Sequence, residues 1–428
     1  MGCIPTKTLA GSARAIYIAT RGGEFGFRAS QVEADWARVR ARKDQVVRGI
    51  VAGLTERLER NPRITLIRGW AQFLDARRLA VGDRVIRTDK VILASGVVPR
   101  VPDVPGLREV GYLTNETILE LEALPQSLVV IGGGPEGMEF GQIFRRFGVR
   151  VTVLQRRDRI LPREDPDISR EVARLLEEEG VEIHTNAVPT RVRRTPSGVS
   201  VAARVEGREQ VFEASRILVA AGRAPHDLAG VRLDAAGVEG DPEHGVRVDA
   251  TLRTSAPTVW AIGDVLGRLQ HQHFSVYTGR LAARNAVSGA GLTYDTAGIP
   301  GAVFTDPECA RIGLAVEEAM RRGRRVKVGQ QPVAAISRAQ AMGETRGFIK
   351  VVLDADTDRL LGMHILAPMG ADLLPQGMLM MRMGAVATLQ DVVYIHPTLS
   401  EGLKAALARA EAAAVVPPAP PADARVSP

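Results

Sequence analysis

The amino-acid sequence predicts an α/β fold with a parallel sheet near the middle of the chain and a smaller α+β domain towards its end. The parallel sheet is indicated by the apolar run Leu128–Ile131, a glycine-rich turn and a helical stretch over Met138–Phe147. A short, fully apolar run before such a turn is typical of a buried parallel strand. From about Pro300 the pattern changes, because Gly347–Leu353 and Leu360–Ile365 have the pattern of two strands joined by a turn, with helical stretches around them.

The glycine-rich turn belongs to a strand–helix–strand unit with clear ends. Gly148 closes the helix, and Val149–Leu154 follows as the next strand. A further buried strand is expected over Ile217–Ala221, ending at Gly222. Apolar strands that alternate with helices in this way indicate parallel pairing.

A second helix is expected from Asp165 to Gly180. Asp165 is a suitable N-cap, Pro166 suits the first helical position, and Gly180 suits the stop. The apolar residues of this stretch share one helical face, which is therefore expected to be buried: Ile168, Val172, Leu175 and Leu176.

Composition excludes several classes of protein. The 428 residues suffice for two or three domains, and 45% hydrophobic with 25% charged residues is ordinary for a globular protein. The formal charge of +7 comes from basic residues scattered among acidic ones, which does not favour nucleic-acid binding. No apolar run approaches the roughly 20 residues of a membrane span, and no secretion signal is present. The cytoplasm is therefore the expected location.

Two cysteines, Cys3 and Cys309, are too few for a disulfide-rich scaffold, which agrees with a reducing compartment. Cys309 is expected to be a buried core thiol. The stretch 413–428 is rich in proline and alanine and is expected to be disordered. No metal site is predicted.

The pattern Gly132-x-Gly134-x-x-Gly137 matches a dinucleotide-binding fingerprint. The first glycine permits the tight turn, the second lets the backbone approach a pyrophosphate, and the third allows close helix–strand packing. The helix N-terminus attracts phosphate charge. A bare glycine pattern is weak evidence, since a merely structural turn has the same residues, but its place between strand and helix favours nucleotide binding.

The end of the next strand bears on the choice between NAD and NADP. An acidic residue there normally accepts a hydrogen bond from the ribose 2′-OH, whereas arginines accommodate a 2′-phosphate. This chain has Gln155, Arg156 and Arg157 and no carboxylate. The alternative is that both arginines are simply exposed at a strand end. The residues favour NADP(H) over NAD(H).

Five motifs, in register over nearly the whole chain, resemble those of the class I pyridine nucleotide–disulfide oxidoreductases, such as glutathione reductase, dihydrolipoamide dehydrogenase and mercuric reductase. The motifs are Cys3-Ile4-Pro5-Thr6-Lys7, the turn 94–100 (ASGVVPR), the turn 221–225 (AGRAP), the segment 254–264 ending in AIGD, and the segment 396–401 (HPTLSE).

The resemblance implies two Rossmann-like dinucleotide-binding domains, for FAD and NAD(P), and a C-terminal α+β dimerisation domain, hence a homodimer. The expected segments are 1–105 (first part of the FAD domain), 106–226 (NAD(P) domain), 227–298 (second part of the FAD domain), 299–412 (dimerisation domain) and 413–428 (tail).

The resemblance also implies site residues. Cys3 matches the cysteine that forms the charge-transfer thiolate beside the flavin. Lys7 and Glu139 match an ion pair beside the flavin; independently, a carboxylate near the start of a phosphate-binding helix is costly without a cation nearby. The residues assigned to FAD are Lys7, Gly69, Ala71, Ser95, Gly96, Gly263 and Asp264, and those assigned to NAD(P) are Gly132, Gly134, Gly137, Glu139, Gln155, Arg156, Arg157 and Gly222.

His396 precedes a helix, where alone it would be equally understandable as a cap or a core residue. By the resemblance, His396 is the general acid/base for the thiol and Glu401 orients it, both reaching the active site of the partner subunit. A histidine with a carboxylate on its far nitrogen keeps one tautomer and gains basicity.

Three features depart from the family's pattern. The family's flavin domain begins with a strand, a GxGxxG turn and a helix, about 40 residues that would precede Met1. The exchange cysteine, in Cys-x4-Cys spacing with Cys3, would also precede Met1. A chain starting at Met1 is therefore expected to bind FAD poorly. The tail lacks the paired cysteines of mercuric reductases, and His396 stands where they carry tyrosine. Pro135 and Glu136 stand where relatives have an aromatic or aliphatic residue beside the nicotinamide site.

The hypothesis is an FAD-dependent NAD(P)H oxidoreductase that passes hydride through flavin to a redox disulfide, and then to a small-molecule or protein disulfide, or to a metal ion as in mercuric reductase. His396 favours a disulfide substrate. The alternatives are a flavoprotein transhydrogenase or quinone-type reductase without a disulfide, and a non-enzymatic, truncated NAD(P)-binding dimer.

Overall fold

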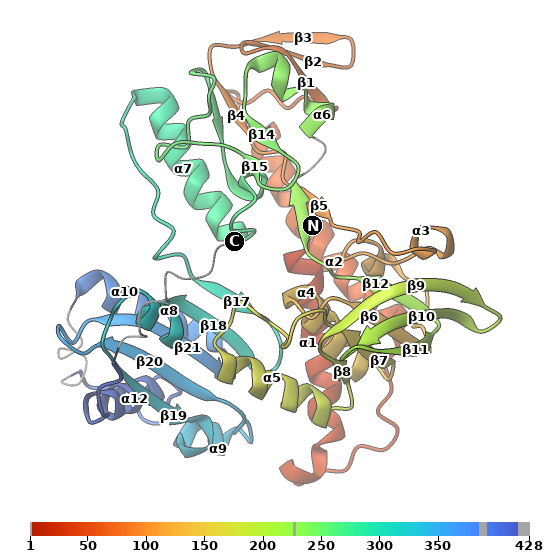
Figure 1. Cartoon of the computed structure of the whole chain (residues 1–428), viewed down its shortest axis with the longest axis vertical. Helices are drawn as coiled ribbons and strands as arrows, with labels where there is room; N and C mark the ends of the chain where they lie inside the picture. Colours follow the sequence, from red (N-terminus) through yellow and green to blue (C-terminus); the bar gives the residue numbers. More distant parts are fainter. Residues whose placement is uncertain (1, 226–227, 385–391, 418–428) are drawn as a thin grey trace. The chain divides into compact units, whose positions relative to one another are not determined.

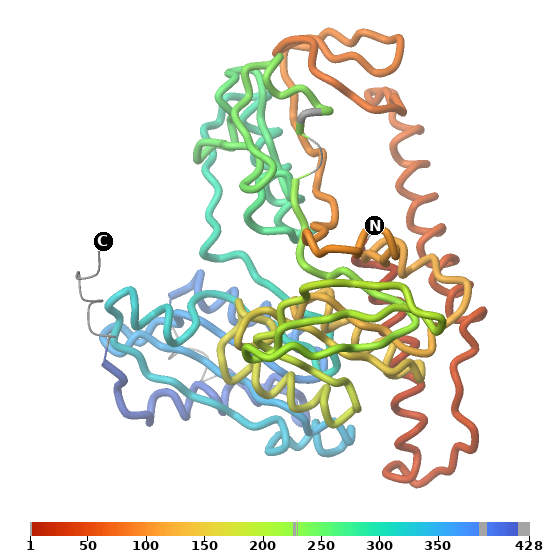
Figure 2. The backbone as a smooth tube through the Cα atoms, turned by 45° about the vertical axis from the view of Figure 1, so that its right-hand side comes forward, coloured from red at the N-terminus to blue at the C-terminus, as the bar shows by residue number. Residues whose placement is uncertain are grey.

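The computed structural model describes residues 2–225, 228–384 and 392–417. Contacts divide the chain into two compact units, each described here by itself (Figures 1 and 2). The first unit comprises Met1–Asp44, Asp103–Ala220 and Ala297–Pro428, and the second comprises Gln45–Pro102 and Ala221–Thr296. Three of these breaks lie near the expected boundaries after 105, 226 and 298, but the first unit combines parts of three expected domains. The domain assignments stay predictions.

The first unit contains the predicted parallel sheet, with strand order β12-β6-β7-β8. An antiparallel sheet with strand order β11-β10-β9 lies between β8 and β12 in the chain and appears in yellow-green in both views (Figures 1 and 2). The elements of this part are α1 (Cys3–Thr20), η1 (Gly22–Phe25), α2 (Trp36–Glu59, which runs on into the second unit), α3 (Leu107–Val110), η2 (Thr117–Glu120), β6 (Ser127–Ile131), α4 (Pro135–Arg146), β7 (Arg150–Leu154), α5 (Pro166–Glu178), β8 (Glu182–His184), β9 (Ala187–Thr195), β10 (Gly198–Val205), β11 (Arg208–Ala214) and β12 (Arg216–Val219).

The strand–turn–helix unit is confirmed as β6, α4 and β7. All five residues of β6 are buried, as a strand covered on both faces requires. Helix α4 begins at Pro135, three residues before the predicted start at Met138. The fixed φ of proline and its missing N–H suit the first helical position, so the helix extends back to the glycine turn.

Helix α5 confirms the second predicted helix, but the predicted cap is wrong. Asp165 stands at the N-cap position, yet its side chain makes no capping hydrogen bond to the backbone. Its carboxylate instead lies 2.6 Å from the ammonium group of Lys350, and both side chains are almost fully buried. A full charge at this distance attracts the carboxylate more strongly than a backbone N–H does.

The C-terminal part of the first unit is a five-stranded antiparallel sheet with strand order β17-β18-β21-β20-β19. Helix α10 packs against β18 and β21, and α12 packs against β19 and β20 (Figure 1). The elements are β17 (Gly301–Val303), β18 (Glu308–Gly313), α8 (Val316–Arg321), β19 (Val326–Pro332), η5 (Val333–Ala335), α9 (Ser337–Ala341), β20 (Phe348–Asp354), β21 (Leu360–Ala367), α10 (Gly370–Met383) and α12 (Glu401–Glu411).

Both strands predicted in this region are present as β20 and β21, joined by the predicted turn. The Asp354 carboxylate closes that turn by accepting hydrogen bonds from the N–H groups of Asp356 and Thr357, each at 3.0 Å. Cys309 lies in β18 and is buried, as predicted. Part of the tail expected to be disordered is paired instead: Val416 and Val326 exchange two backbone hydrogen bonds. Residues 418–428 lie outside the described residues.

The second unit contains several small sheets. Strands β4 and β16 pair in parallel, and β5 pairs antiparallel with β13. Within the described part of the chain, no helix combines the length and the apolar character needed to cross a bilayer. The elements of the unit are β1 (Ala71–Asp75), β2 (Arg78–Val81), β3 (Arg84–Arg87), β4 (Val91–Leu93), β5 (Val97–Pro99), β13 (Arg223–Pro225), α6 (Leu228–Val231), η3 (Leu233–Ala236), β14 (Gly240–Asp241), β15 (Gly245–Val246), β16 (Val259–Ala261), η4 (Gly263–Leu266) and α7 (Gln272–Ser288).

Two glycines of α4 give a matched pair of substitutions. A Cβ atom on Gly137 would lie 1.9 Å from the Gly132 carbonyl oxygen, whereas a Cβ on Gly141 meets nothing closer than 3.8 Å. We expect Gly137→Ala to destabilise the fold by about 2 kcal/mol or more, and Gly141→Ala to be neutral or stabilising by up to about 1 kcal/mol, because alanine favours helix. Urea denaturation of both variants checks this; equal stability of the two would contradict the close helix–strand packing.

Candidate functional site

The glycine-rich turn between β6 and α4 has the geometry that close phosphate approach requires. Gly132 adopts a φ of 118°, which side-chain-bearing residues rarely adopt. Gly137 lies against the backbone of Gly132, while a Cβ on Gly134 would meet open space. Helix α4 has no side-chain hydrogen bond at its N-cap, Gly134, and its N-terminus attracts the negative charge of a bound anion.

The three residues after β7 divide into one buried residue and two exposed ones. The Gln155 carboxamide accepts a hydrogen bond from the Gly133 N–H (3.2 Å) and donates one to the Arg159 carbonyl (2.9 Å). Gln155 therefore ties the glycine turn to the loop that follows β7. Arg156 and Arg157 are exposed, which leaves their guanidinium groups accessible to a ligand.

Lys7 and Glu139 form the predicted ion pair, which joins α1 to α4. The Lys7 ammonium lies 2.6 Å from Glu139 Oε2, and Glu139 is 6% exposed. The other oxygen, Oε1, accepts a hydrogen bond from the Phe304 N–H at 2.9 Å. Lys7 also lies 4.5 Å from the centre of the Phe304 ring, a cation–π contact. The carboxylate is thus satisfied on both oxygens.

Cys3 is the first residue of α1, one helical turn before Lys7, and residues four apart in a helix lie on one face. Its thiol is free and the residue is exposed. Cys309 is also free but buried in β18, so the two cysteines do not form a pair. Through the Lys7–Glu139 ion pair, the helix that carries this thiol is joined to the helix that begins at the dinucleotide turn.

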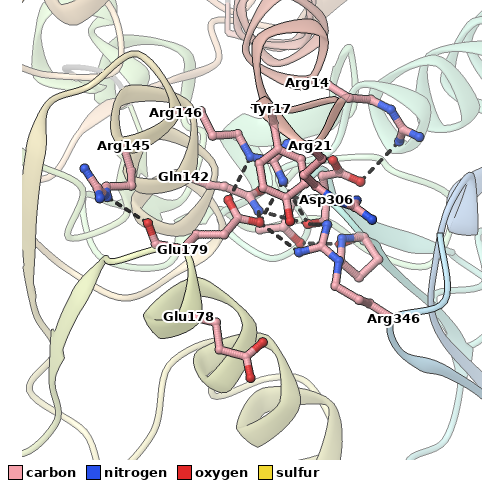
Figure 3. A network of polar contacts seen from close by, with 12 residues as sticks. Arg14, Tyr17, Arg21, Gln142, Arg145, Arg146, Glu178, Glu179, Asp306 and Arg346 are labelled. Atoms are coloured by element: carbon pink, nitrogen blue, oxygen red, sulfur yellow. Dashed lines mark hydrogen bonds and ion pairs between the residues drawn. The ribbon is translucent and has the colours of Figure 1, made fainter. Parts of the chain in front are cut away.

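A network of buried charges that the sequence did not predict lies further along α1 and α4 (Figure 3). Arg146 donates to Glu179 Oε2 and to Asp306 Oδ2, both at 2.7 Å. Its guanidinium carbon lies 3.9 Å from the centre of the Tyr17 ring. Arg346, from the loop before β20, donates to Glu179 Oε1 at 2.9 Å. The sequence held one indication of this network. Arg14 and Tyr17 on α1, and Arg21 directly after it, have the spacing of residues on one face of a helix.

Asp306 is the acceptor at the centre of this network. Burial by itself would raise the pKa of Asp306, but the positive charges of Arg146 and Arg14 outweigh it and hold the pKa below its ordinary value. Arg14 Nη1 lies 3.1 Å from Asp306 Oδ1. The Gln142 side chain binds the backbone of the same residue, accepting from its N–H and donating to its carbonyl. Asp306 therefore joins α1, α4 and the segment before β18.

His396 and Glu401 form the predicted hydrogen-bonded pair ahead of α12. His396 Nδ1 lies 3.0 Å from Glu401 Oε1, and Oε2 accepts from the Thr398 N–H at 2.8 Å. The Thr398 N–H and then His396 hold the pKa of Glu401 below its ordinary value. His396 is exposed, and its Nε2 side is accessible for proton exchange.

The second unit contains the other residues assigned to FAD. Ser95 Oγ is buried without a hydrogen-bond partner, and the adjacent Gly96 has a φ of 75°. Gly263 has a φ of 68° and lies against Ser275. Burial raises the pKa of Asp264, opposed by Arg223 at 3.6 Å. An unsatisfied hydroxyl and a half-buried carboxyl fit the hydroxyl groups of a ribityl chain.

The remaining residues assigned to the cofactors, Gly69, Ala71 and Gly222, contact neighbouring strands and turns of the protein itself. A Cβ on Gly69 would lie 2.5 Å from Val81, and Ala71 begins β1 opposite the same valine. Gly222 has a φ of 99°, and its carbonyl accepts a hydrogen bond from the Arg100 N–H. The second unit holds no glycine-rich strand–turn–helix among its described residues, so a phosphate cradle for FAD is not among them.

The fold and the site are those of a dinucleotide-binding α/β protein. Residues 1–279 match the pyridine nucleotide-disulphide oxidoreductase family, and residues 299–407 match its dimerisation domain, which implies a homodimer. The Thermus scotoductus dihydrolipoyl dehydrogenase is 36% identical over 94% of this chain and 87% of its own length. The chain belongs to the pyridine nucleotide-disulphide oxidoreductases, a family of flavoprotein oxidoreductases.

Other relatives differ in how much of their length is matched. The Bacillus cereus mercuric reductase is 33% identical over 95% of this chain, but the chain spans only 64% of that protein. A solved structure of the HOCl-induced flavoprotein disulfide reductase RclA from Escherichia coli, a cysteine-to-serine variant with Cu(II), superposes with a TM-score of 0.86. It shares 32% identity and matches over 95% of this chain and 89% of its own.

The Lys7–Glu139 pair can be tested by a double-mutant cycle. Lys7→Met leaves the buried Glu139 carboxylate without its cation, and we expect a loss of about 3 kcal/mol in unfolding free energy, at the lower end for a buried pair because Lys7 is partly exposed. Adding Glu139→Gln removes the charge and keeps an acceptor for the Phe304 N–H, so most of the loss is recovered. Urea denaturation of the set checks this; additive losses would mean that the two residues do not interact.

Asp306 gives a prediction for pH dependence. Because its folded-state pKa is depressed, its stabilisation is present above the unfolded value of about 4 and is lost as pH falls through the folded value. We expect Asp306→Asn to cost about 3 kcal/mol at pH 7, with the difference from wild type shrinking towards about pH 3. Denaturation at several pH values measures it. Asp358→Asn, which breaks an exposed pair with Lys327, is the control and costs below about 1 kcal/mol.

Proposed function

We propose that the chain is an NAD(P)H-dependent flavoprotein disulfide reductase, with NADP(H) favoured. The observation that carries the proposal is the connection through α1 and α4. Cys3 and Lys7 lie one turn apart on α1, and Lys7 pairs with Glu139 on the helix that starts at the dinucleotide turn. The helix that carries an exposed thiol is joined by one ion pair to the helix that begins at the dinucleotide turn. This connection supports electron transfer from a bound dinucleotide to the thiol site.

The dinucleotide is assigned to the turn of Gly132, Gly134 and Gly137 and to the start of α4. Its pyrophosphate would lie at the N-terminus of this helix, where the helix dipole favours negative charge. Arg156 and Arg157 would bind a 2′-phosphate. The Gln155 side chain is instead hydrogen-bonded to the Gly133 N–H and to the Arg159 carbonyl. A guanidinium binds phosphate through two donors, which supports NADP(H) over NAD(H).

Within the second unit, FAD is assigned to Ser95, Gly96, Gly263 and Asp264, with the fit resting on the unpartnered Ser95 hydroxyl and the half-buried Asp264. When bound, the flavin would supply the redox chemistry between the nicotinamide, which gives up a hydride, and a disulfide, which is reduced to a thiol pair. The described residues supply its ribityl side.

The thiol chemistry is assigned to Cys3 and to an exchange cysteine in Cys-x4-Cys spacing with it. A thiolate attacks the substrate disulfide, one S–S bond forms as another breaks, and the leaving thiolate takes a proton. His396 of a second copy would donate that proton, with Glu401 fixing its tautomer through the 3.0 Å hydrogen bond. A histidine suits a thiolate leaving group, so a disulfide is favoured over Hg(II) as substrate.

The test begins with the in-frame codons upstream of Met1, where the resemblance places the exchange cysteine. The natural gene product is then assayed for NADPH oxidation with a disulfide and, separately, with a quinone. We expect disulfide reduction that Cys3→Ser abolishes. Quinone reduction that survives Cys3→Ser, without disulfide reduction, would establish the alternative reductase. Dinucleotide binding with neither activity would establish the non-enzymatic alternative.

Cofactor choice gives a separate prediction. Replacing Arg156 and Arg157 by alanine removes the charge-assisted hydrogen bonds to a 2′-phosphate, each about 1.5–3 kcal/mol. Together these losses would raise the Kd for NADP⁺ by roughly 100-fold or more, and we expect the Kd for NAD⁺ to stay within about threefold. Titration calorimetry with both dinucleotides measures the ratio. Arg150→Ala, at the opposite end of β7, is the control; an unchanged NADP⁺ affinity in the double variant would contradict the assignment.

A further inference from the structure

The loop between β7 and α5, residues 155–165, carries Arg156 and Arg157 and is fastened to the glycine turn at its beginning. Gln155 bridges the Gly133 N–H and the Arg159 carbonyl. The Leu161 N–H donates to the Gly133 carbonyl at 2.7 Å. A Cβ on Gly133 would meet Gln155 and Ile160 at 3.0 Å. The position of this loop therefore sets the position of the turn that would hold the pyrophosphate.

The middle of the loop is strained. Leu161 has a φ of 43°, in the left-handed region that branched side chains rarely adopt, and it is buried. Such a conformation persists only where the surroundings determine it from several sides. The adjacent Ile160 carbonyl accepts a hydrogen bond from the Ser169 hydroxyl of α5. The loop is thus held in this conformation by contacts with the glycine turn on one side and with α5 on the other.

The far end of the loop is anchored to the C-terminal sheet by buried ion pairs. Lys350 of β20 is 3% exposed, and its ammonium lies 2.6 Å from Asp165 Oδ2 and 2.6 Å from Asp167 Oδ1. Next to it, Arg311 of β18 donates to Glu164 at 2.9 Å. Lys350 thus pairs with the two carboxylates at the start of α5, directly after the loop.

We propose that Lys350 is a positioning residue for the dinucleotide, acting through Asp165 and the 155–165 loop; this rests on the proposed function of the glycine turn. Buried ion pairs are no more stabilising than apolar packing, because both charges lose their hydration. They do require one geometry, and here that geometry fixes the end of a strained loop. The sheet that matches the dimerisation domain thereby holds the loop in the shape that binds dinucleotide.

The experiment measures NADP⁺ binding to the full chain by titration calorimetry, together with thermal stability. Lys350→Met is expected to raise the Kd about tenfold, within the usual range of coupling between distant sites, and Lys350→Arg is expected to restore most of the affinity. Lys350→Met also leaves Asp165 buried without a cation and lowers stability. Lys350→Met with Asp165→Asn removes both charges, so stability recovers while the Kd stays raised. Asp165→Asn leaves Lys350 paired with Asp167; it is a milder variant for the case that the others fail to fold, and its Kd is also expected to rise.

Two further readouts separate positioning from general stability. Trypsin is expected to cleave after Arg156 and Arg157 faster in the folded Lys350 variants, because the released loop opens more often. Lys327→Met breaks an exposed pair with Asp358 in the same sheet, and neither affinity nor cleavage is expected to change. A wild-type Kd in any folded variant that lacks the Lys350–Asp165 pair overturns the inference. Wild-type chain that binds no dinucleotide overturns the proposed function and this inference with it.

Discussion

The buried carboxylate of Glu139 is the constraint on which the arrangement of the site depends. A carboxylate at 6% exposure is tolerated only if its charge is paired and its oxygens are hydrogen-bonded. Lys7 supplies the charge and the Phe304 N–H supplies a second hydrogen bond. These partners lie on three segments far apart in the sequence: α1, α4 and the residues after β17. Satisfying one side chain therefore fixes the helix that carries Cys3 beside the helix that begins at the glycine turn.

The same solution recurs at the other end of the two helices. Arg146 on α4 lies between Glu179 and Asp306 while its guanidinium stacks on Tyr17 of α1 (Figure 3). Both ends of the contact between α1 and α4 thus depend on buried charges with partners outside the pair. Apolar contacts alone would allow α1 to slide along α4 by a fraction of a turn. The two charge clusters, one at each end of the contact, prevent this movement. The register of α1 on α4, and with it the place of the thiol, follows from these two clusters.

The sequence predicted what depends on local chemistry. The glycine turn, the strands beside it, Gly148 as a helix stop and the Asp354 turn all follow from backbone preferences of residues near one another, and the structure confirms them. Motifs in register also identified Lys7, Glu139, His396 and Glu401 as pairs. The sequence did not predict the network around Asp306, because its partners lie as much as 292 residues away and no local pattern encodes such a contact. Gln155 was assigned to NAD(P) from its position in the motif, whereas its hydrogen bonds to Gly133 and to the Arg159 carbonyl cannot be seen in the sequence.

Asp165 shows how tertiary contacts override a correct local signal. Its residue type and position are those of a helix cap, and α5 does begin at the next residue. Yet the carboxylate pairs with Lys350 and makes no hydrogen bond to the backbone of its own helix, because both side chains are buried and a buried charge is tolerated only when it is paired. The helix start is therefore defined twice, by Pro166 in the local sequence and by the sheet through Lys350. That second definition reaches beyond α5 itself, since the residues just before it form the strained loop that meets Gly133. The pairing of Lys350 with Asp165 thereby fixes the end of the 155–165 loop, and the loop in turn fixes the backbone of the glycine turn through Gly133. Lys350 thus acts on the glycine turn through the loop.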